Sequence, residues 1–289
     1  MKQQTPSKNY EGKLLTSKSP FAINEAFRTL RTNMFYTSKG EKCPVYGITS
    51  CYANSGKSLV IANAAISFSQ LNKKVLLIDC DLRNSVVHKI FGVDKGLGIS
   101  ELLAGSDNAV DRTLRKTSYD NLQVITSGGT PPNPTELLAS DRMKKLIDIL
   151  KNHFDVIFID LPPIGLVSDA AVINEIVTGY AFTVRAGFDD RRDVSQVLSV
   201  MEQMDMNVIG FILNDVNVKA GKYGKYGKYG RYGRYGRYSR YGKYYGRYGK
   251  YYGRYGRYYG KYGKYYGSYG GYGKDNDQNN YNNNYYNNY

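Results

Sequence analysis

The sequence predicts an α/β fold in which helices cover both faces of a parallel β-sheet. Short and almost purely apolar segments, at residues 74–79 and 155–159, are typical of central strands that are buried on both faces of such a sheet. Longer stretches with helical periodicity separate these segments, which indicates repeated βα units. Ligands of such sheets bind at the carboxyl ends of the strands, so functional residues are expected there.

Three regions divide the chain. Residues 1–20 are expected to be a flexible polar lead, 21–218 a folded domain, and 219–289 a disordered tail. In the domain, a helix is predicted over 24–36, with apolar residues at helical spacing on one side and charged residues on the other. The apolar residues are Ala26, Phe27, Leu30 and Met34, and the charged residues are Glu25, Arg28 and Arg31.

The other elements follow in order along the chain. Strands are expected at 45–50, 74–79, 122–126, 155–159, 180–184 and 208–214. Helices are expected at 57–71, 140–153 and 194–204, the second with Ser140 as N-cap.

Residues 50–58 follow a predicted strand and open a predicted helix, as a P-loop does. Gly56, Lys57 and Ser58 match the end of the G-x-x-x-x-G-K-[ST] pattern, in which backbone amides, the Lys and the hydroxyl bind phosphates and Mg²⁺. The first Gly of the pattern is replaced by Cys51, and Asn54 tolerates left-handed backbone. The alternative is a chance Gly-Lys-Ser at the start of a helix.

Two further motifs place carboxylates at strand ends. Asp79 and Asp81 end the segment VLLIDCDLR and project to the same side, where Mg²⁺ would offset their repulsion. Asp160 follows four apolar residues in VIFIDLPP, the Walker B pattern. Each motif alone is also compatible with a strand that ends in a solvated loop, but the three in this order point to a nucleotide site.

This combination resembles the bacterial protein-tyrosine kinases of capsular and exopolysaccharide synthesis, of the cytoplasmic Gram-positive type. The resemblance spans roughly residues 19–214 and the Tyr-rich end. It rests on ITSCYANSGKS, VLLIDCDLR, VIFIDLPP, the E-x-x-R-x-x-R of Glu25, Arg28 and Arg31, and SGGTPPNPTELLAS. The related partitioning ATPases carry a Lys where this chain has Tyr52, which counts against that group.

The resemblance implies a P-loop NTPase-like fold, ATP and Mg²⁺ as cofactors, and roles for individual residues. Arg83 is left with two roles, pairing with a carboxylate or neutralising phosphate, and Asn214 is either a base contact or a turn residue. Nucleotide binding is assigned to Cys51, Tyr52, Ala53, Asn54, Ser55, Gly56, Lys57, Ser58 and Asn214. The metal is assigned to Ser58, Asp79 and Asp160, and catalysis to Lys57, Asp79, Asp81, Arg83 and Asp160.

The resemblance also implies partners. Glu25, Arg28 and Arg31 would join subunits into a homo-oligomeric ring, such as an octamer, although a solvated helix face with weak ion pairs is the simpler interpretation. A membrane activator of the polysaccharide co-polymerase type and a cognate tyrosine phosphatase are expected. No stretch approaches 18 apolar residues, so no membrane-spanning helix is predicted. The resemblance implies a cytoplasmic chain that its partner recruits to the inner face of the membrane.

The tail is built from Lys/Arg-Tyr-Gly repeats. Residues 221–289 hold 24 of the 30 Tyr and a net charge of +13, and they lack Ala, Val, Ile, Leu, Met, Phe and Cys. Such a segment buries too little apolar surface to offset its ordering entropy, so it is predicted to be disordered and to serve as the autophosphorylation substrate. The expected acceptors are Tyr223, Tyr226, Tyr229, Tyr244, Tyr245, Tyr251, Tyr252, Tyr258, Tyr259, Tyr265, Tyr266, Tyr285 and Tyr286.

Three functions compete on these observations. The first is an ATP-dependent tyrosine kinase that phosphorylates tails in trans and regulates polysaccharide synthesis and export. The others are a P-loop ATPase without tyrosine transfer and a non-catalytic scaffold with a self-associating tail. Nucleic acid is not expected as a partner, although Tyr among Lys and Arg also suits single-strand binding. Three scattered Cys favour neither a zinc cluster nor a disulfide framework.

Overall fold

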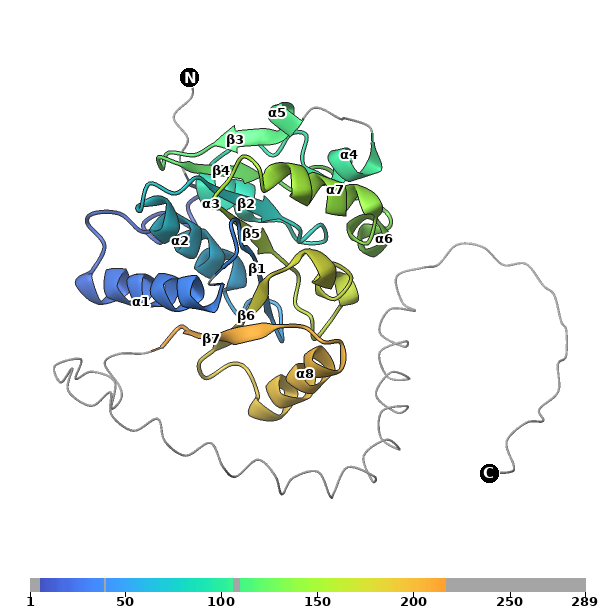
Figure 1. The fold of residues 1–289 in the computed structure, drawn as a ribbon. Coiled ribbons are helices and arrows are strands. Elements are labelled where there is room, and N and C mark those ends of the chain that lie inside the picture. The colour runs from blue at the N-terminus through green and yellow to red at the C-terminus, as the bar shows by residue number, and fades with distance from the viewer. Residues whose placement is uncertain (1–5, 39, 106–109, 217–289) are drawn as a thin grey trace, which may run out of the picture. The chain divides into compact units, whose positions relative to one another are not determined.

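A computed structural model describes residues 6–38, 40–105 and 110–216, and the tail lies outside this part of the chain. The described residues form a seven-stranded sheet in the order β3-β4-β2-β5-β1-β6-β7 (Figure 1). All pairs are parallel except β3 with β4. The strands are β1 (Val45–Ser50), β2 (Val75–Asp79), β3 (Leu114–Lys116), β4 (Leu122–Ile125), β5 (Val156–Asp160), β6 (Gly179–Arg185) and β7 (Val208–Asn214).

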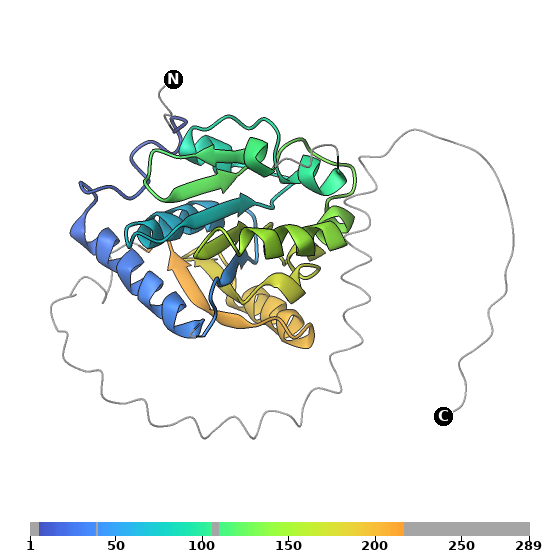
Figure 2. The ribbon, with the colours of Figure 1, turned by 45° about the horizontal axis from the view of Figure 1, so that its top comes forward.

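Helices pack on both faces of the sheet, as predicted, because successive strand side chains point to opposite sides. In β2, Leu77 faces a core shared with α1, α2 and α3, whereas Ile78 faces a core shared with α4, α6, α7 and α8 (Figures 1 and 2). The helices are α1 (Phe21–Thr37), α2 (Lys57–Ser69), α3 (Val87–Phe91), α4 (Ile99–Ala104), α5 (Val110–Thr113), α6 (Pro134–Leu138), α7 (Asp141–Leu150) and α8 (Arg191–Gln203), with 3₁₀ turns η1 (Ser168–Ala170) and η2 (Asn174–Ile176).

Most predicted elements are confirmed within one or two residues at each end. The strands predicted over 45–50 and 208–214 coincide with β1 and β7, and Asn214 is the last residue of β7. The short elements were not predicted: β3, α3, α4, α5, α6, η1 and η2 are three to six residues long. Elements of that length show no recognisable periodicity, and their packing against the sheet holds them in place.

The lead differs from the flexible segment that was expected. Leu14 and Leu15 are buried against α2, where the Asn63 side chain accepts from the Leu15 amide at 2.7 Å and donates to the Lys13 carbonyl at 3.1 Å. At its other end, the Ser7 amide donates to the Lys89 carbonyl of α3 at 3.0 Å. We call residues 7–15 the strap, since they connect α2 with α3.

Helix α1 presents its apolar side to α2, but its charged residues do not form the single outward ridge that was expected. Arg28 pairs with Glu25 at 2.7 Å on the surface. Arg31 instead turns towards α2 and donates to the Ser67 carbonyl at 2.5 Å, because it shares a face with Phe27 and Met34. Of the predicted apolar residues, Ala26 is exposed.

Candidate active site

The P-loop, residues 50–58, connects β1 with the first turn of α2. Its backbone turns through left-handed conformations at Asn54 (φ 64°) and Gly56 (φ 88°), so the expectation that Asn54 adopts left-handed backbone is confirmed. The positive φ favours glycine at position 56, and a Cβ atom there would also lie 2.1 Å from Nδ2 of Asn214 and force that side chain to move. The loop therefore leads directly into the N-terminus of α2, where the first backbone amides have no partner within the helix and can bind phosphate.

Carboxylates from two neighbouring strands meet the P-loop lysine. Asp79 and Asp160 lie side by side in the register of β2 and β5, and both are fully buried. The Lys57 ammonium lies 2.8 Å from Asp81, 3.5 Å from Asp160 and 3.2 Å from the Ser58 hydroxyl. All five residues were predicted for the site, and the structure brings them into one cluster.

The cluster holds more negative than positive charge in a place without solvent. Burial raises the pKa of Asp79, and the neighbouring charge of Asp160 raises it further. Burial also raises the pKa of Asp160, although Lys57 opposes this shift. Burial by itself would lower the pKa of Lys57, but Asp160 and Asp81 outweigh it and raise the pKa, so the ammonium stays charged.

Unsatisfied oxygens in this cluster suit a divalent cation. Within the described part of the chain, Oδ1 of Asp79 and both carboxylate oxygens of Asp160 lack a partner at hydrogen-bond geometry. Lys57 and Ser58 nevertheless lie close enough to Asp160 to lower the pKa of its carboxyl group. Oxygen donors of this kind are what Mg²⁺ prefers. No three acidic, His or Cys side chains among these residues converge on one point, so Mg²⁺ would need water and phosphate oxygens as further ligands, which is its usual arrangement.

Arg83 lies beside this cluster and pairs with a carboxylate, the first of its two predicted roles. Its guanidinium donates to Asp169 at 2.9 and 3.1 Å, and Thr135 donates to the same carboxylate at 2.6 Å. Asp169 is fully buried and was not predicted from the sequence. The contact links the loop after β2 with η1, and it leaves 43% of the Arg83 side chain exposed.

The remaining predicted nucleotide-binding residues surround the P-loop. Cys51 is 2% exposed and packs in the core with α8, so it offers only its backbone to a ligand. Ala53 and Asn54 are exposed. The side-chain amide of Asn214 donates to the backbone carbonyl of Ser55 at 3.0 Å, which places the end of β7 beside the loop.

Two acidic residues after β6 also contact the P-loop and were missed. Asp189 accepts from the Ser55 hydroxyl at 3.0 Å, and Asp193 accepts from the Tyr52 hydroxyl. More than 130 residues separate the partners in each pair, so no local pattern could have found them. Glu25 and Arg28 are on α1, outside this cluster, and the predicted phosphoacceptor tyrosines are outside the described residues.

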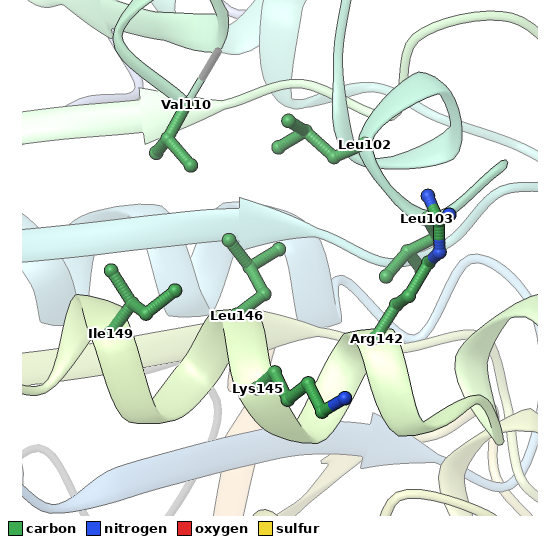
Figure 3. Close-up of a pocket in the computed structure, with 7 residues that line it drawn as sticks. All are labelled: Leu102, Leu103, Val110, Arg142, Lys145, Leu146 and Ile149. Carbon is green, nitrogen blue, oxygen red and sulfur yellow. The ribbon is translucent and has the colours of Figure 1, made fainter. Parts of the chain in front are cut away.

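A cavity of ≈180 Å³ lies elsewhere, between α4, α5 and α7 (Figure 3). Leu102, Leu103, Leu146 and Ile149 line it, and none of the predicted site residues does. No helix of the described residues has the length and apolar character needed to cross a membrane.

Comparisons with known proteins agree with this geometry. Residues 52–177 match the AAA domain family. The chain is 40% identical over 202 residues to the tyrosine-protein kinase CpsD of Streptococcus agalactiae, covering 69% of this chain and 86% of that protein. It is 37% identical over 196 residues to the tyrosine-protein kinase etk of Escherichia coli, covering 68% of this chain but 27% of that longer protein.

Among solved structures, the kinase domain of Escherichia coli ETK superposes with a TM-score of 0.66 at 35% identity, covering 72% of this chain and 84% of that domain. The predicted P-loop NTPase-like fold, a mostly parallel sheet with flanking helices, is thus confirmed for the described residues.

Proposed function

The chain belongs to the bacterial tyrosine-protein kinases of the CpsD type, and on that premise we propose that it transfers the γ-phosphoryl group of ATP to tyrosine hydroxyls. The observation that carries the proposal is the buried cluster of Lys57, Asp79, Asp81 and Asp160 at the N-terminus of α2. Phosphoryl transfer depends mainly on positioning and on charge neutralisation, which such a cluster supplies.

Each side chain has a distinct task in this proposal. Lys57 leaves its carboxylate partners to bind phosphate oxygens, together with the amides at the start of α2. Ser58, Asp79 and Asp160 hold Mg²⁺, which neutralises phosphate charge when bound. Asp81, released by Lys57, orients the phenol and accepts its proton, since a tyrosine with a pKa near 10 is neutral at pH 7.

The transfer breaks the bond between the γ-phosphorus and the bridging oxygen to the β-phosphate. The phenolic oxygen forms the new bond to phosphorus, and ADP leaves with the electron pair. Arg83 holds η1 next to the cluster through Asp169, so in this proposal it shapes the site without contacting phosphate.

The family further suggests what the kinase acts on. Tail tyrosines of one subunit enter the site of a neighbour in a ring, a membrane activator of the co-polymerase type recruits the chain to the inner face of the membrane, and a phosphatase reverses the modification. This cycle would regulate polysaccharide synthesis and export. Support comes from the 24 tyrosines of residues 221–289, whose Gly-rich spacing suits an extended substrate.

The test is autophosphorylation of the full chain with Lys57→Met and Asp81→Asn. We expect each change to reduce phosphotyrosine formation by about a hundredfold or more, because each removes a group that acts on the reacting atoms. Matched changes at exposed positions of α7, Lys145→Met and Asp148→Asn, should leave the rate unchanged.

Phosphotyrosine mapping by mass spectrometry after incubation with Mg-ATP and the activator separates the alternatives. Modified tail tyrosines support the kinase, whereas phosphate release without phosphotyrosine would indicate an ATPase, and neither product would indicate a scaffold. Undiminished phosphotyrosine in both active-site variants would remove this cluster from the mechanism.

A further inference from the structure

The P-loop of this chain contains a single glycine, Gly56, and its first half, residues 51–55, consists of residues with side chains. A phosphate-binding loop must present its backbone amides in one direction. Here side chains of the loop form hydrogen bonds and ring contacts with the surrounding structure. Most of these attachments come from one stretch, which runs from the end of β6 to the first turn of α8.

Asp189 contacts the loop with one carboxylate oxygen and its own strand with the other. Its Oδ1 accepts from the Ser55 hydroxyl at 3.0 Å, and its Oδ2 accepts from the Arg185 amide at 2.6 Å. The Arg185 guanidinium donates to the Asn54 carbonyl at 3.3 Å and to Asp215 at 2.9 Å. The outer turn of the P-loop is thus attached to the ends of both β6 and β7.

Tyr52 makes the second attachment. Its hydroxyl donates to the Asp193 carboxylate, and its ring meets Phe188 edge to face with centroids 6.2 Å apart. The Arg185 guanidinium lies 5.2 Å from the centre of the Phe188 ring. Asp190 caps α8 by accepting from the Arg192 amide, which fixes the first turn of the helix, where Asp193 lies.

Asp189 and Asp193 also act electrostatically on Cys51, the residue at the start of the loop. Burial raises the pKa of the Cys51 thiol to about 11, and the charges of Asp193 and Asp189 contribute to the same shift. Cys51 is therefore a neutral, buried side chain at neutral pH. It anchors the loop in the core while the two acids hold the outer turn.

We propose that Asp189 and Asp193 are positioning residues that hold the P-loop in its phosphate-binding conformation through Ser55 and Tyr52. We call Arg185, Asp189 and Asp193 the P-loop clamp. A loop that is already ordered loses less conformational entropy when it binds, so the clamp increases nucleotide affinity without touching the ligand. This inference rests on the nucleotide-binding function proposed above and names the residues that set its affinity.

The test measures Mg-ATP binding to the full chain by calorimetry, together with KM for ATP and kcat of autophosphorylation. We expect Tyr52→Phe and Asp193→Ala each to weaken Mg-ATP binding by about 5- to 20-fold, the effect of losing one charge-assisted hydrogen bond. KM should rise by the same factor while kcat at saturating ATP changes little, because the reacting groups stay in place. The double variant should be no weaker than either single variant.

A conservative change and a distant one complete the design. Asp193→Asn keeps an oxygen acceptor for Tyr52 and should restore most of the affinity, and Glu202→Ala in the last turn of α8 should bind as wild type does. Hydrogen exchange of residues 51–56 should rise in both Tyr52→Phe and Asp193→Ala. Unchanged affinity and exchange in Tyr52→Phe and Asp193→Ala, or fully additive losses in the double variant, would overturn the proposal. Calorimetry gives this answer even if the chain transfers no phosphate to tyrosine.

Discussion

Asp79 and Asp160 are carboxylates that the fold buries side by side before any ligand arrives. Because burial raises the pKa of Asp79, its ionisation opposes folding. A group whose pKa is higher in the folded than in the unfolded chain stabilises the fold below its unfolded pKa, and that stability is lost as the pH rises through its folded pKa. Ionised Asp79 therefore lowers the stability of the fold at neutral pH, and a bound Mg²⁺ would offset this electrostatic cost.

Asp79→Asn tests this balance. Without nucleotide, we expect the variant to be more stable than the wild type by about 1–3 kcal/mol near neutral pH, since it removes a buried charge and keeps an acceptor for the Val87 amide. The gain should shrink as the pH falls and should vanish only below about 4, where Asp79 becomes protonated in the unfolded chain as well. Thermal unfolding across this pH range measures the difference. The exposed change Glu202→Gln should show no such trend, and a variant less stable than wild type at neutral pH would contradict the expectation.

Mg²⁺ should reverse the order of these two proteins. Wild type gains stability that grows with the ratio of the Mg-ATP concentration to its Kd, whereas Asp79→Asn lacks one proposed ligand, binds more weakly and should gain less. The measurement is the Mg-ATP-dependent shift in melting temperature of each protein. Equal shifts would mean that Asp79 does not contribute to the metal site.

Helix α1 combines an inner face packed on α2 with an exposed apolar surface. Phe21, Ile23, Phe35 and Tyr36 are 78%, 47%, 58% and 69% exposed, which is more than solubility favours. These exposed side chains suit a contact between subunits, which stays a prediction from the family. The position of Arg31 decides which residue should be changed to test it. Arg31 is engaged with α2, so its reversal would disturb the fold of one subunit as well as any contact between subunits.

Arg28→Glu is the cleaner probe of assembly. Its side chain is 59% exposed and pairs only weakly with Glu25, so we expect little loss of stability. If α1 joins subunits, light scattering of the full chain should show a smaller assembly for this variant. Glu25→Arg combined with Arg28→Glu restores the local pair and serves as the control. An unchanged molar mass for Arg28→Glu would exclude this residue from the contact.

The strap shows how an apolar pair can order a segment that is polar overall. Asn63 satisfies the Leu15 amide and the Lys13 carbonyl while Leu14 and Leu15 enter the core. We expect Asn63→Ala to cost about 1–3 kcal/mol, because it leaves buried backbone groups without partners. Chemical denaturation measures this loss. Asn152→Ala, which removes an exposed bond to the Asp148 carbonyl, should change stability by less than about 0.5 kcal/mol.

Charge is distributed unevenly over the entire chain. Residues 221–289 carry +13 of the total of +15, so the folded domain is nearly neutral. Each phosphotyrosine adds about −1.5 to −2 charges, so about seven to nine modifications would neutralise this segment. The number of modified tyrosines would then control attraction to anionic surfaces in a graded way.

The full chain should therefore bind vesicles that contain phosphatidylserine at low salt when it is dephosphorylated, and lose this binding after autophosphorylation. Co-sedimentation before and after phosphatase treatment measures the change. The Lys57→Met chain, which we expect to remain unphosphorylated, should bind the vesicles at low salt both before and after incubation with Mg-ATP. Identical binding of phosphorylated and dephosphorylated wild type would show that charge on these tyrosines does not act as a switch.

Local patterns in the chain were sufficient for every strand of the sheet except the short β3, for the P-loop and for the carboxylates at the sheet edge. Apolar runs and helical spacing report burial directly, and Lys57, Asp79 and Asp160 follow strands whose carboxyl ends must meet. Contacts between distant segments required the folded arrangement. The pairing of Arg83 with Asp169, the inward turn of Arg31 and the attachment of Tyr52 to Asp193 all join residues that no periodicity relates. Periodicity records which face a residue buries, whereas its partner depends on how whole elements pack against one another in space.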